Sequence, residues 1–189
     1  MCGGDRGRRT MEDVEIDTLR AGDIDGVLAL QEANQAEHDG TLSARMPRAF
    51  FAAILSDMPV GDMPVGGLSV GGLPVIVARR QGRVVGFLVS SPKHPPPEAP
   101  VRRAMLRAWP GADDAYAYGP VCVAAEERGR GVAAAMFAAL RALLPGREGV
   151  LFIRSDNAAS IRAHAKMGMR QVATFEHDGE TMLVLTYVG

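Results

Sequence analysis

The segment EERGRGVAAAMFAALRALL, residues 126–144, constrains the fold of this chain more than any other. Its second half repeats apolar residues at helical spacing, and Gly129 and Gly131 stand immediately before that helix. The preceding residues 115–125 read AYAYGPVCVAA, a pattern that predicts a strand. A strand, a glycine loop and a helix in this order predict a backbone exposed at a helix N-terminus.

This loop has the chemistry of an anion site. A helix start offers unpaired N–H groups and the positive end of the helix dipole, and glycines let a phosphate approach the backbone. Arg128 and Arg130 add positive charge. We therefore expect the N–H groups from Arg128 to Ala133 to hold a phosphate or pyrophosphate. An ordinary glycine turn into an amphipathic helix is the alternative, and the loop alone leaves both open.

Known phosphate motifs fit the loop to different degrees. A nucleotide P-loop needs a lysine and a hydroxyl residue after its last glycine, and neither is present. The dinucleotide fingerprint G-x-G-x-x-[GA] matches at Gly129, Gly131 and Ala134, with Asp156 placed as a ribose partner. However, five residues separate Val123 from the first glycine, and too little chain follows Asp156 to complete a dinucleotide-binding sheet.

Periodicity along the chain predicts a mixed-sheet α/β domain. The expected strands lie at 13–19, in a hairpin over 74–91, at 115–125, at 150–155 and in a second hairpin over 170–188. The expected helices lie at 24–34, 46–55, 101–109, 131–144 and 157–167.

Single residues predict local details of these elements. Asp23 is placed to cap the first helix, and Gly168 to end the last one. Gly119 and Pro120 inside the strand at 115–125 indicate a bulge or an edge, because proline cannot donate to a sheet ladder.

The domain organisation is simple. We expect a disordered leader at 1–11 and a single domain at 12–189. A Gly/Pro-rich insertion at 57–74 repeats the unit DMPVG, and its composition excludes a helix or a central strand. It could cover a substrate as a lid, but a slack loop is the expectation we prefer.

Composition excludes several classes of protein. The net charge of −1 across 189 residues favours neither nucleic acid nor an anionic membrane as a partner. No apolar run approaches the ~20 residues of a membrane helix. Cys2 and Cys122 cannot build a disulfide framework, so we expect a reducing, cytoplasmic location. The four histidines show no metal-ligand spacing, and no metal site is expected.

The stretch VCVAAEERGRGVAAAMFAAL resembles the signature of the GNAT-type N-acetyltransferase superfamily. That signature is [QR]-x-x-G-x-[GA] between a bulged strand and a helix, and here it falls on Arg128, Gly131 and Ala133. A second stretch, NAASIRAHAKMGM, resembles the motif N-x-x-[AS]-x-x-x-Y-x-x-x-G-F of the same superfamily. The matching positions are Asn157, Ser160, Lys166 and Gly168.

The resemblance implies the GNAT fold, with a splayed central sheet flanked by helices, and acetyl-CoA as co-substrate. The pantetheine arm would pair with backbone groups of Val121 and Val123, and Pro120 is a plausible local cause of the splay. The pyrophosphate would lie on the loop, with Asn157 and Ser160 also near the cofactor. The loop residues implied are Arg128, Gly129, Arg130, Gly131, Val132 and Ala133.

The chemistry implied is direct attack of a primary amine on the acetyl carbonyl in a ternary complex. A backbone N–H near Val123 could stabilise the oxyanion. The family commonly protonates the leaving thiolate with a tyrosine, but this chain has His164 at that position. We expect His164 to be the acid, while the alternative is that it only packs and water protonates the thiolate.

Several assignments stay open at this point. Candidates for the base that deprotonates the amine are Glu32, Glu37, His38, Tyr116 and Tyr118. The acceptor could be a small molecule or a peptide, and a homodimer is possible. A non-catalytic acyl-CoA-binding or regulatory domain is the main alternative function, and a nicotinamide-dependent enzyme is a weaker one. Cys122, in an apolar strand, is expected to be a core residue and not a nucleophile.

Overall fold

The computed structural model describes residues 10–35, 42, 45–55, 73–94 and 99–189. Most of the expected leader and of the glycine- and proline-rich insertion lies outside the described residues. Glu37 and His38, two candidates for the base, also lie outside them. Met11, which we expected to end the leader, packs against the core from a short 3₁₀ turn.

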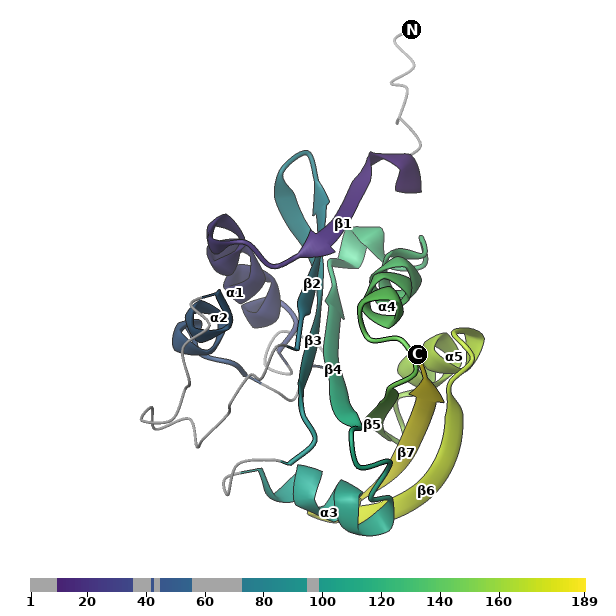
Figure 1. Cartoon of the computed structure of the whole chain (residues 1–189). Helices are drawn as coiled ribbons and strands as arrows, with labels where there is room; N and C mark the ends of the chain where they lie inside the picture. Colours follow the sequence, from purple (N-terminus) through teal and green to yellow (C-terminus); the bar gives the residue numbers. More distant parts are fainter. Residues whose placement is uncertain (1–9, 36–41, 43–44, 56–72, 95–98) are drawn as a thin grey trace, which may run out of the picture.

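A single seven-stranded sheet forms the centre of the molecule, in the order β1-β2-β3-β4-β5-β7-β6 (Figure 1). Neighbouring strands are antiparallel except β4 and β5, which are parallel. The strands are β1 Val14–Thr18, β2 Val75–Arg80, β3 Arg83–Pro92, β4 Tyr116–Val123, β5 Glu148–Arg154, β6 Arg170–His177 and β7 Glu180–Val188. A mostly antiparallel sheet confirms the mixed α/β class and disagrees with the parallel dinucleotide-binding fold.

The helices follow the expected order along the chain. They are α1 Ile24–Glu32, α2 Arg48–Leu55, α3 Pro100–Ala108, α4 Val132–Leu143 and α5 Ala158–Lys166. Short 3₁₀ helices are η1 Met11–Asp13, η2 Ala21–Asp23 and η4 Ala125–Glu127. Each of these α-helices begins and ends within two residues of its predicted bounds.

Helices cover both faces of the sheet (Figure 1). On one face α1 packs on β3 and β4 and also contacts α2, with Val27 completely buried. On the other face α4 packs across the first four strands, with Met136 and Leu140 completely buried. The core is therefore two apolar layers separated by the sheet, and each helix contributes one apolar stripe.

The β4 strand carries a bulge where Gly119 and Pro120 stand. Val121 pairs with Leu88 of β3, whereas Tyr118 pairs with Ser90, so three steps along β4 match two along β3. The extra residue confirms the bulge predicted from the glycine and proline.

Beyond its first two residues, β4 separates from β5. Tyr116 pairs with Gly149 and Ala117 pairs with Val150, and no later pair joins these strands within the described residues. β4 nevertheless continues to Val123, and β5 continues to Arg154. The central sheet is therefore splayed, as the resemblance implied (Figure 1).

Asp23 stands at the N-cap position of α1, as predicted, but its side chain does not cap the helix. Its carboxylate makes no capping hydrogen bond to that helix. Instead it accepts the backbone N–H of Arg20 and pairs with the buried guanidinium of Arg79. Burial raises the pKa of Asp23, but the hydrogen bonds from Arg79 and Arg20 outweigh it and hold that pKa below its usual range. A partner 56 positions away in the sequence could not be read from local spacing.

Candidate functional site

The glycine loop turns the chain from η4 into α4 with two left-handed residues. Gly129 has φ 73° and Gly131 has φ 91°, a region that other residues enter only with strain. A Cβ added to either glycine would meet no atom within 4 Å. Backbone conformation therefore requires these glycines, and the space on the side where a Cβ would stand is open.

The N-terminus of α4 presents backbone donors beside this loop. Gly131 is its N-cap and supplies no side chain to cap it. The first backbone bond across the boundary runs from Ala135 N–H to the Gly131 carbonyl at 2.9 Å. Among the described residues, no hydrogen bond is found for the N–H groups of Val132, Ala133 and Ala134. Together with the helix dipole, these donors favour an anion.

Arg128 lies across the base of the loop. Its Nε donates to the Val123 carbonyl at 3.2 Å, and its Nη2 donates to Oδ1 of the buried Asn34. The Asn34 side chain also donates to the Leu30 carbonyl within α1 at 2.8 Å. Arg128 thus ties the loop to β4 and, through Asn34, to the end of α1. No local sequence signal predicts the contact with Asn34.

A buried ion pair anchors the start of the loop. Glu127 is completely buried, and both its oxygens accept from Arg80, at 2.9 and 3.0 Å. Arg130 Nε lies 3.9 Å from the same carboxylate and donates to the Glu126 carbonyl at 3.0 Å. The sequence analysis missed this pair, because Arg80 belongs to a strand 47 positions earlier.

Val121 and Val123 direct their backbone groups away from β3, and the Val123 carbonyl accepts from Arg128 on that side. Ala124 N–H donates to the Val85 carbonyl of β3 at 2.9 Å. Backbone groups alternate in direction along a strand, so Cys122 also faces β3 while Val121 and Val123 face away from it. β5 has already separated from β4 at these residues. An extended ligand could therefore add to this edge as a strand would.

The α5 helix brings the three expected residues together on one face. Asn157 caps it, with Oδ1 accepting the Ser160 N–H at 3.1 Å. Ser160 Oγ lies 3.2 Å from Nδ1 of His164. At the other end Gly168 has φ 85°, and Met169 N–H donates to the His164 carbonyl at 3.1 Å. This arrangement confirms the predicted glycine stop.

His164 is buried and held in one tautomer. Its Nδ1 lies 2.8 Å from the Ser160 carbonyl, which can only accept, so Nδ1 carries the proton. Burial lowers the pKa of His164, and the hydrogen bond to Ser160 only partly opposes this. The imidazole is therefore neutral at pH 7, with its lone pair on Nε2.

An aromatic cluster lies beside His164 at the base of the splay. The Tyr118 ring lies edge-on to His164 and to Phe137, with ring centres 5.7 and 5.8 Å apart. Tyr187 of β7 also packs on Tyr118, and its hydroxyl is hydrogen-bonded to that of Tyr116. This cluster joins β4, β7, α4 and α5 where β4 and β5 stop pairing.

The remaining candidates for base or nucleophile are occupied or deeply buried. Glu32 is exposed and pairs with Arg45 at 2.9 Å. The Tyr116 hydroxyl is bonded to Tyr187. Burial raises the pKa of the Cys122 thiol to about 12, which agrees with the expected core cysteine and disfavours a thiolate nucleophile.

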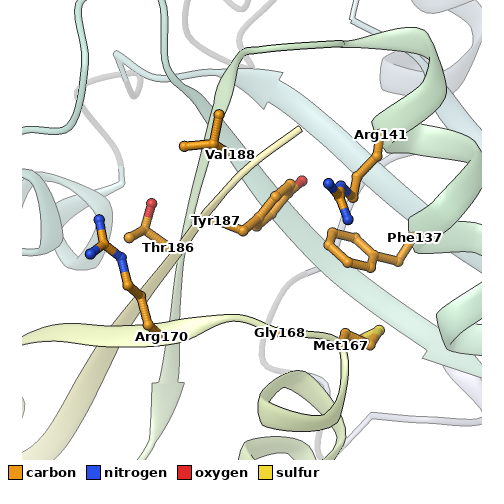
Figure 2. A pocket seen from close by; sticks show the side chains of 8 residues that line it. All are labelled: Phe137, Arg141, Met167, Gly168, Arg170, Thr186, Tyr187 and Val188. Atoms are coloured by element: carbon orange, nitrogen blue, oxygen red, sulfur yellow. The ribbon is translucent and has the colours of Figure 1, made fainter.

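A small pocket of about 270 Å³ opens next to the aromatic cluster. Figure 2 shows Arg141 of α4 beside Phe137 and Tyr187, with Thr186 and Arg170 on the other side. The Arg141 guanidinium lies over the Phe137 ring at 5.6 Å. Met167, Gly168 and Val188 complete the lining, so the pocket lies at the C-terminal ends of α4 and α5 and away from the glycine loop.

Two features are absent from the described part of the chain. There, no three His, Cys, Asp or Glu side chains gather closely enough to hold a metal ion. No helix among the described residues combines the length and apolar content needed to cross a bilayer.

Comparison with known proteins gives one family. A model described as the acetyltransferase (GNAT) family matches residues 29–169. No curated protein matches the sequence of the chain significantly.

Many solved structures share the fold. The ribosomal-protein-alanine N-acetyltransferase of Brucella melitensis superposes with a TM-score of 0.63 at 21% identity, covering 93% of this chain and 99% of that one. Arabidopsis thaliana Naa50, in complex with the bisubstrate analogue CoA-Ac-MVNAL, gives 0.60 at 14% identity, covering 93% and 98%. A GNAT superfamily phosphinothricin acetyltransferase from Sinorhizobium meliloti, in complex with AcCoA, gives 0.63 at 16% identity, covering 93% and 88%.

Proposed function

Because the chain belongs to the GNAT acetyltransferase family, we propose that it moves the acetyl group of acetyl-CoA to a primary amine by direct attack in a ternary complex. Acetyl-CoA is the co-substrate, as in the family, and the Sinorhizobium meliloti neighbour was solved with it.

One observation carries the proposal. β4 leaves β5 after Ala117, and the edge that this exposes leads directly to the uncapped N-terminus of α4. An extended amide-bearing arm fits the exposed edge, and a diphosphate fits the N–H groups at its end. Coenzyme A combines these two chemical features in one molecule. The residues present therefore fit the group that the family implies.

We assign binding of acetyl-CoA mainly to backbone groups of β4 and of the glycine loop. Val121 and Val123 would pair with the pantetheine arm. The N–H groups of the loop would hold the pyrophosphate from Gly129 to Ala133, that is those of Gly129, Arg130, Gly131, Val132 and Ala133. Arg128 would act by holding the loop in place, because its N–H donates to the Ala125 carbonyl at 3.3 Å and its side chain is hydrogen-bonded to Val123 and Asn34. Ser160 and the Asn157 cap would border the cofactor from α5.

His164 would act as a proton acceptor before it acts as a donor. A neutral imidazole with its proton on Nδ1 has no proton on Nε2 to give. It can take the proton that the amine loses on attack and pass it to the leaving sulfur. This sequence keeps His164 in the role expected for the acid, and the lowered pKa favours release of the proton.

Two kinds of acceptor are supported by the neighbours. The Brucella melitensis protein is described as a ribosomal-protein-alanine N-acetyltransferase, and Naa50 was solved with a peptide analogue. The phosphinothricin acetyltransferase takes its name from a small amine. We propose a peptide N-terminus or a small primary amine as acceptor, and a cytoplasmic reaction.

A turnover screen tests the function. The purified protein is given acetyl-CoA and a panel of amines that includes peptide N-termini, amino acids and small amines, and release of free thiol is measured. Turnover with one class supports the proposal. Binding of acetyl-CoA without turnover across the panel would favour the regulatory alternative, and binding of NAD instead would favour the nicotinamide alternative.

Gly131→Asp should abolish tight acetyl-CoA binding while the protein stays folded. The carboxylate would project into the open space that we assign to the pyrophosphate and would repel it. We expect affinity, measured by calorimetry, to fall by at least about 100-fold, or about 2.7 kcal/mol.

Gly82→Asp is the matched control for that variant. Gly82 also has positive φ, at 75°, and open space at its Cβ, but it lies in the β2–β3 hairpin. Gly82→Asp should introduce the same backbone strain but leave the affinity for acetyl-CoA unchanged. Equal affinity in both variants would refute the phosphate site on the loop.

A further inference from the structure

Tyr118 holds a buried polar atom that the fold leaves unsatisfied. Among the described residues, its hydroxyl is one of three buried side-chain polar atoms without a hydrogen-bond partner. The other two are Nη1 of Arg79 and Nε of Arg102, and each of these guanidinium groups donates a hydrogen bond through another nitrogen. A buried hydroxyl without a partner destabilises a fold, so its presence at this place calls for a ligand or a role.

The position of Tyr118 in β4 indicates which ligand atom its hydroxyl could meet. Ala117 makes the last pair with β5, and the bulge at Gly119 and Pro120 follows Tyr118 directly. Tyr118 is thus the first residue of β4 after the two strands part. A pantetheine arm that follows Val123 and Val121 toward this point would bring its sulfur to the base of the splay.

The phenol ring is held on three sides. Its centre lies 5.6 Å from that of Tyr187, 5.7 Å from that of His164 and 5.8 Å from that of Phe137, all edge-on. These contacts come from β7, α5 and α4, so packing fixes the ring while its hydroxyl has no bond. A rigid ring with an unsatisfied donor is preorganised to meet a charge that develops during reaction.

The neighbouring His164 cannot be this hydrogen-bond donor. Its Nδ1 proton is used by the Ser160 carbonyl, and its Nε2 has no proton in the neutral state. Burial raises the pKa of Tyr118, so its hydroxyl keeps its proton throughout the neutral pH range. Of the two groups in contact, the phenol is the standing hydrogen-bond donor.

Resting on the proposed function, we propose that the Tyr118 hydroxyl donates a hydrogen bond to the sulfur of the leaving thiolate. The amine nitrogen forms the new C–N bond, the C–S bond breaks, and its electron pair goes to sulfur. The proton lost by the amine reaches sulfur through His164, and Tyr118 keeps its own proton. The family's hydroxyl on α5 would then be replaced in this chain by one on β4, across the splay.

The thiol of bound CoA reports this hydrogen bond without any acceptor. Thiolate absorbance is titrated against pH in the CoA complex, and the same titration with desulfo-CoA subtracts the protein groups, among them His164, Tyr116 and Tyr187. In Tyr118→Phe we expect the pKa of the bound thiol to rise by about one unit, a tenfold loss of thiolate. CoA affinity for the thiol form should stay within about twofold.

Stability separates this role from a structural one. Tyr118→Phe keeps the ring and removes an unbonded hydroxyl, so its melting temperature should equal or exceed that of the wild type. As control, the double variant Tyr116→Phe/Tyr187→Phe removes a bonded hydroxyl pair from the same cluster and should leave the thiol pKa unchanged.

Three outcomes decide the matter. A bound thiol whose pKa is the same in wild type and Tyr118→Phe would overturn the proposal. An equal rise in the double control variant would also overturn it, since any loss of cluster polarity would then suffice. Failure of CoA to bind the wild type would overturn the proposed function itself, which is a different result.

Discussion

His164, the proposed catalytic residue, shows how burial can change the direction in which a proton is transferred. Histidine is the side chain that titrates nearest neutrality, and an exposed one would be partly charged at pH 7. Here burial lowers the pKa, and the Ser160 carbonyl holds the proton on Nδ1. In the proposed mechanism His164 therefore acts as a base when the amine attacks.

The pH profile of turnover distinguishes the two roles of His164. If neutral His164 is required, kcat falls as pH drops through a pKa below the ordinary value of about 6.5. If protonated His164 were required, kcat would fall as pH rises through that same value. The measurement uses an amine acceptor that titrates outside this range, so that only the enzyme contributes.

His164→Gln provides the comparison for this profile. Glutamine keeps polarity and approximate size but does not titrate, so we expect the acid limb to disappear and kcat to fall by about 100-fold. Affinity for acetyl-CoA should change little. An acid limb that persists in the variant would remove His164 from the mechanism.

At the residue scale, local signals predicted backbone roles better than side-chain partners. The glycine loop before α4 and the Gly168 stop were predicted because each follows from a few consecutive residues. The Asp23 side chain was misassigned and Asn34 was missed, since their partners Arg79 and Arg128 are distant in the chain.

At the scale of elements, the glycine loop depends on the η4 turn before it. That turn contains Glu127, whose carboxylate is completely buried against Arg80 of β2. Arg80 also donates to the Thr10 carbonyl at 3.1 Å, which ties the first described residue to the same group. The glycine loop is thus fastened to β2, which is separated from β4 by β3 in the sheet order, and to the first described residue.

Breaking the buried Arg80–Glu127 pair should lower the free energy of unfolding far more than breaking the exposed Arg83–Glu126 pair. Glu127→Ala would remove the buried carboxylate from Arg80 and leave it only the exposed Asp13 as an ion-pair partner, and we expect the free energy of unfolding to fall by about 3–5 kcal/mol in urea titrations. Acetyl-CoA affinity should fall as well, because the loop loses its anchor.

The adjacent pair Arg83–Glu126 is the control for that variant. Its side chains are 65% and 44% exposed, so Glu126→Ala should cost less than about 1 kcal/mol. Replacing both Arg80 and Glu127 with leucine should be less harmful than the single change, because no buried charge is left. Equal losses for Glu126→Ala and Glu127→Ala would contradict this anchoring role.

Secondary structure was largely predictable because the residues of each helix, strand or turn themselves indicate its type. The hairpin turns at Gln81–Gly82 and Asp178–Gly179 both have positive φ at the two turn residues, as their sequences predict. The bulge in β4 followed from its glycine and proline. The bounds shifted by one or two residues, since helix and strand ends fray.

At the scale of the whole molecule, the sheet order creates the site. β4 and β5 are the parallel pair in an otherwise antiparallel sheet, and they pair at only two positions. The splay between them ends at the N-terminus of α4 on one side and at the cluster around His164 on the other. The order of strands depends on long-range contacts, so periodicity alone could not predict it, and the resemblance supplied that expectation.

The most direct measurement follows the backbone amides when acetyl-CoA is added to the isotope-labelled protein. We expect the largest shifts in the N–H resonances of residues 128–134 and of Val121 and Val123, with slowed hydrogen exchange at the same amides. Desulfo-CoA should reproduce the loop shifts. Saturable binding that leaves these amides unchanged and perturbs another part of the molecule would contradict the proposed cofactor site.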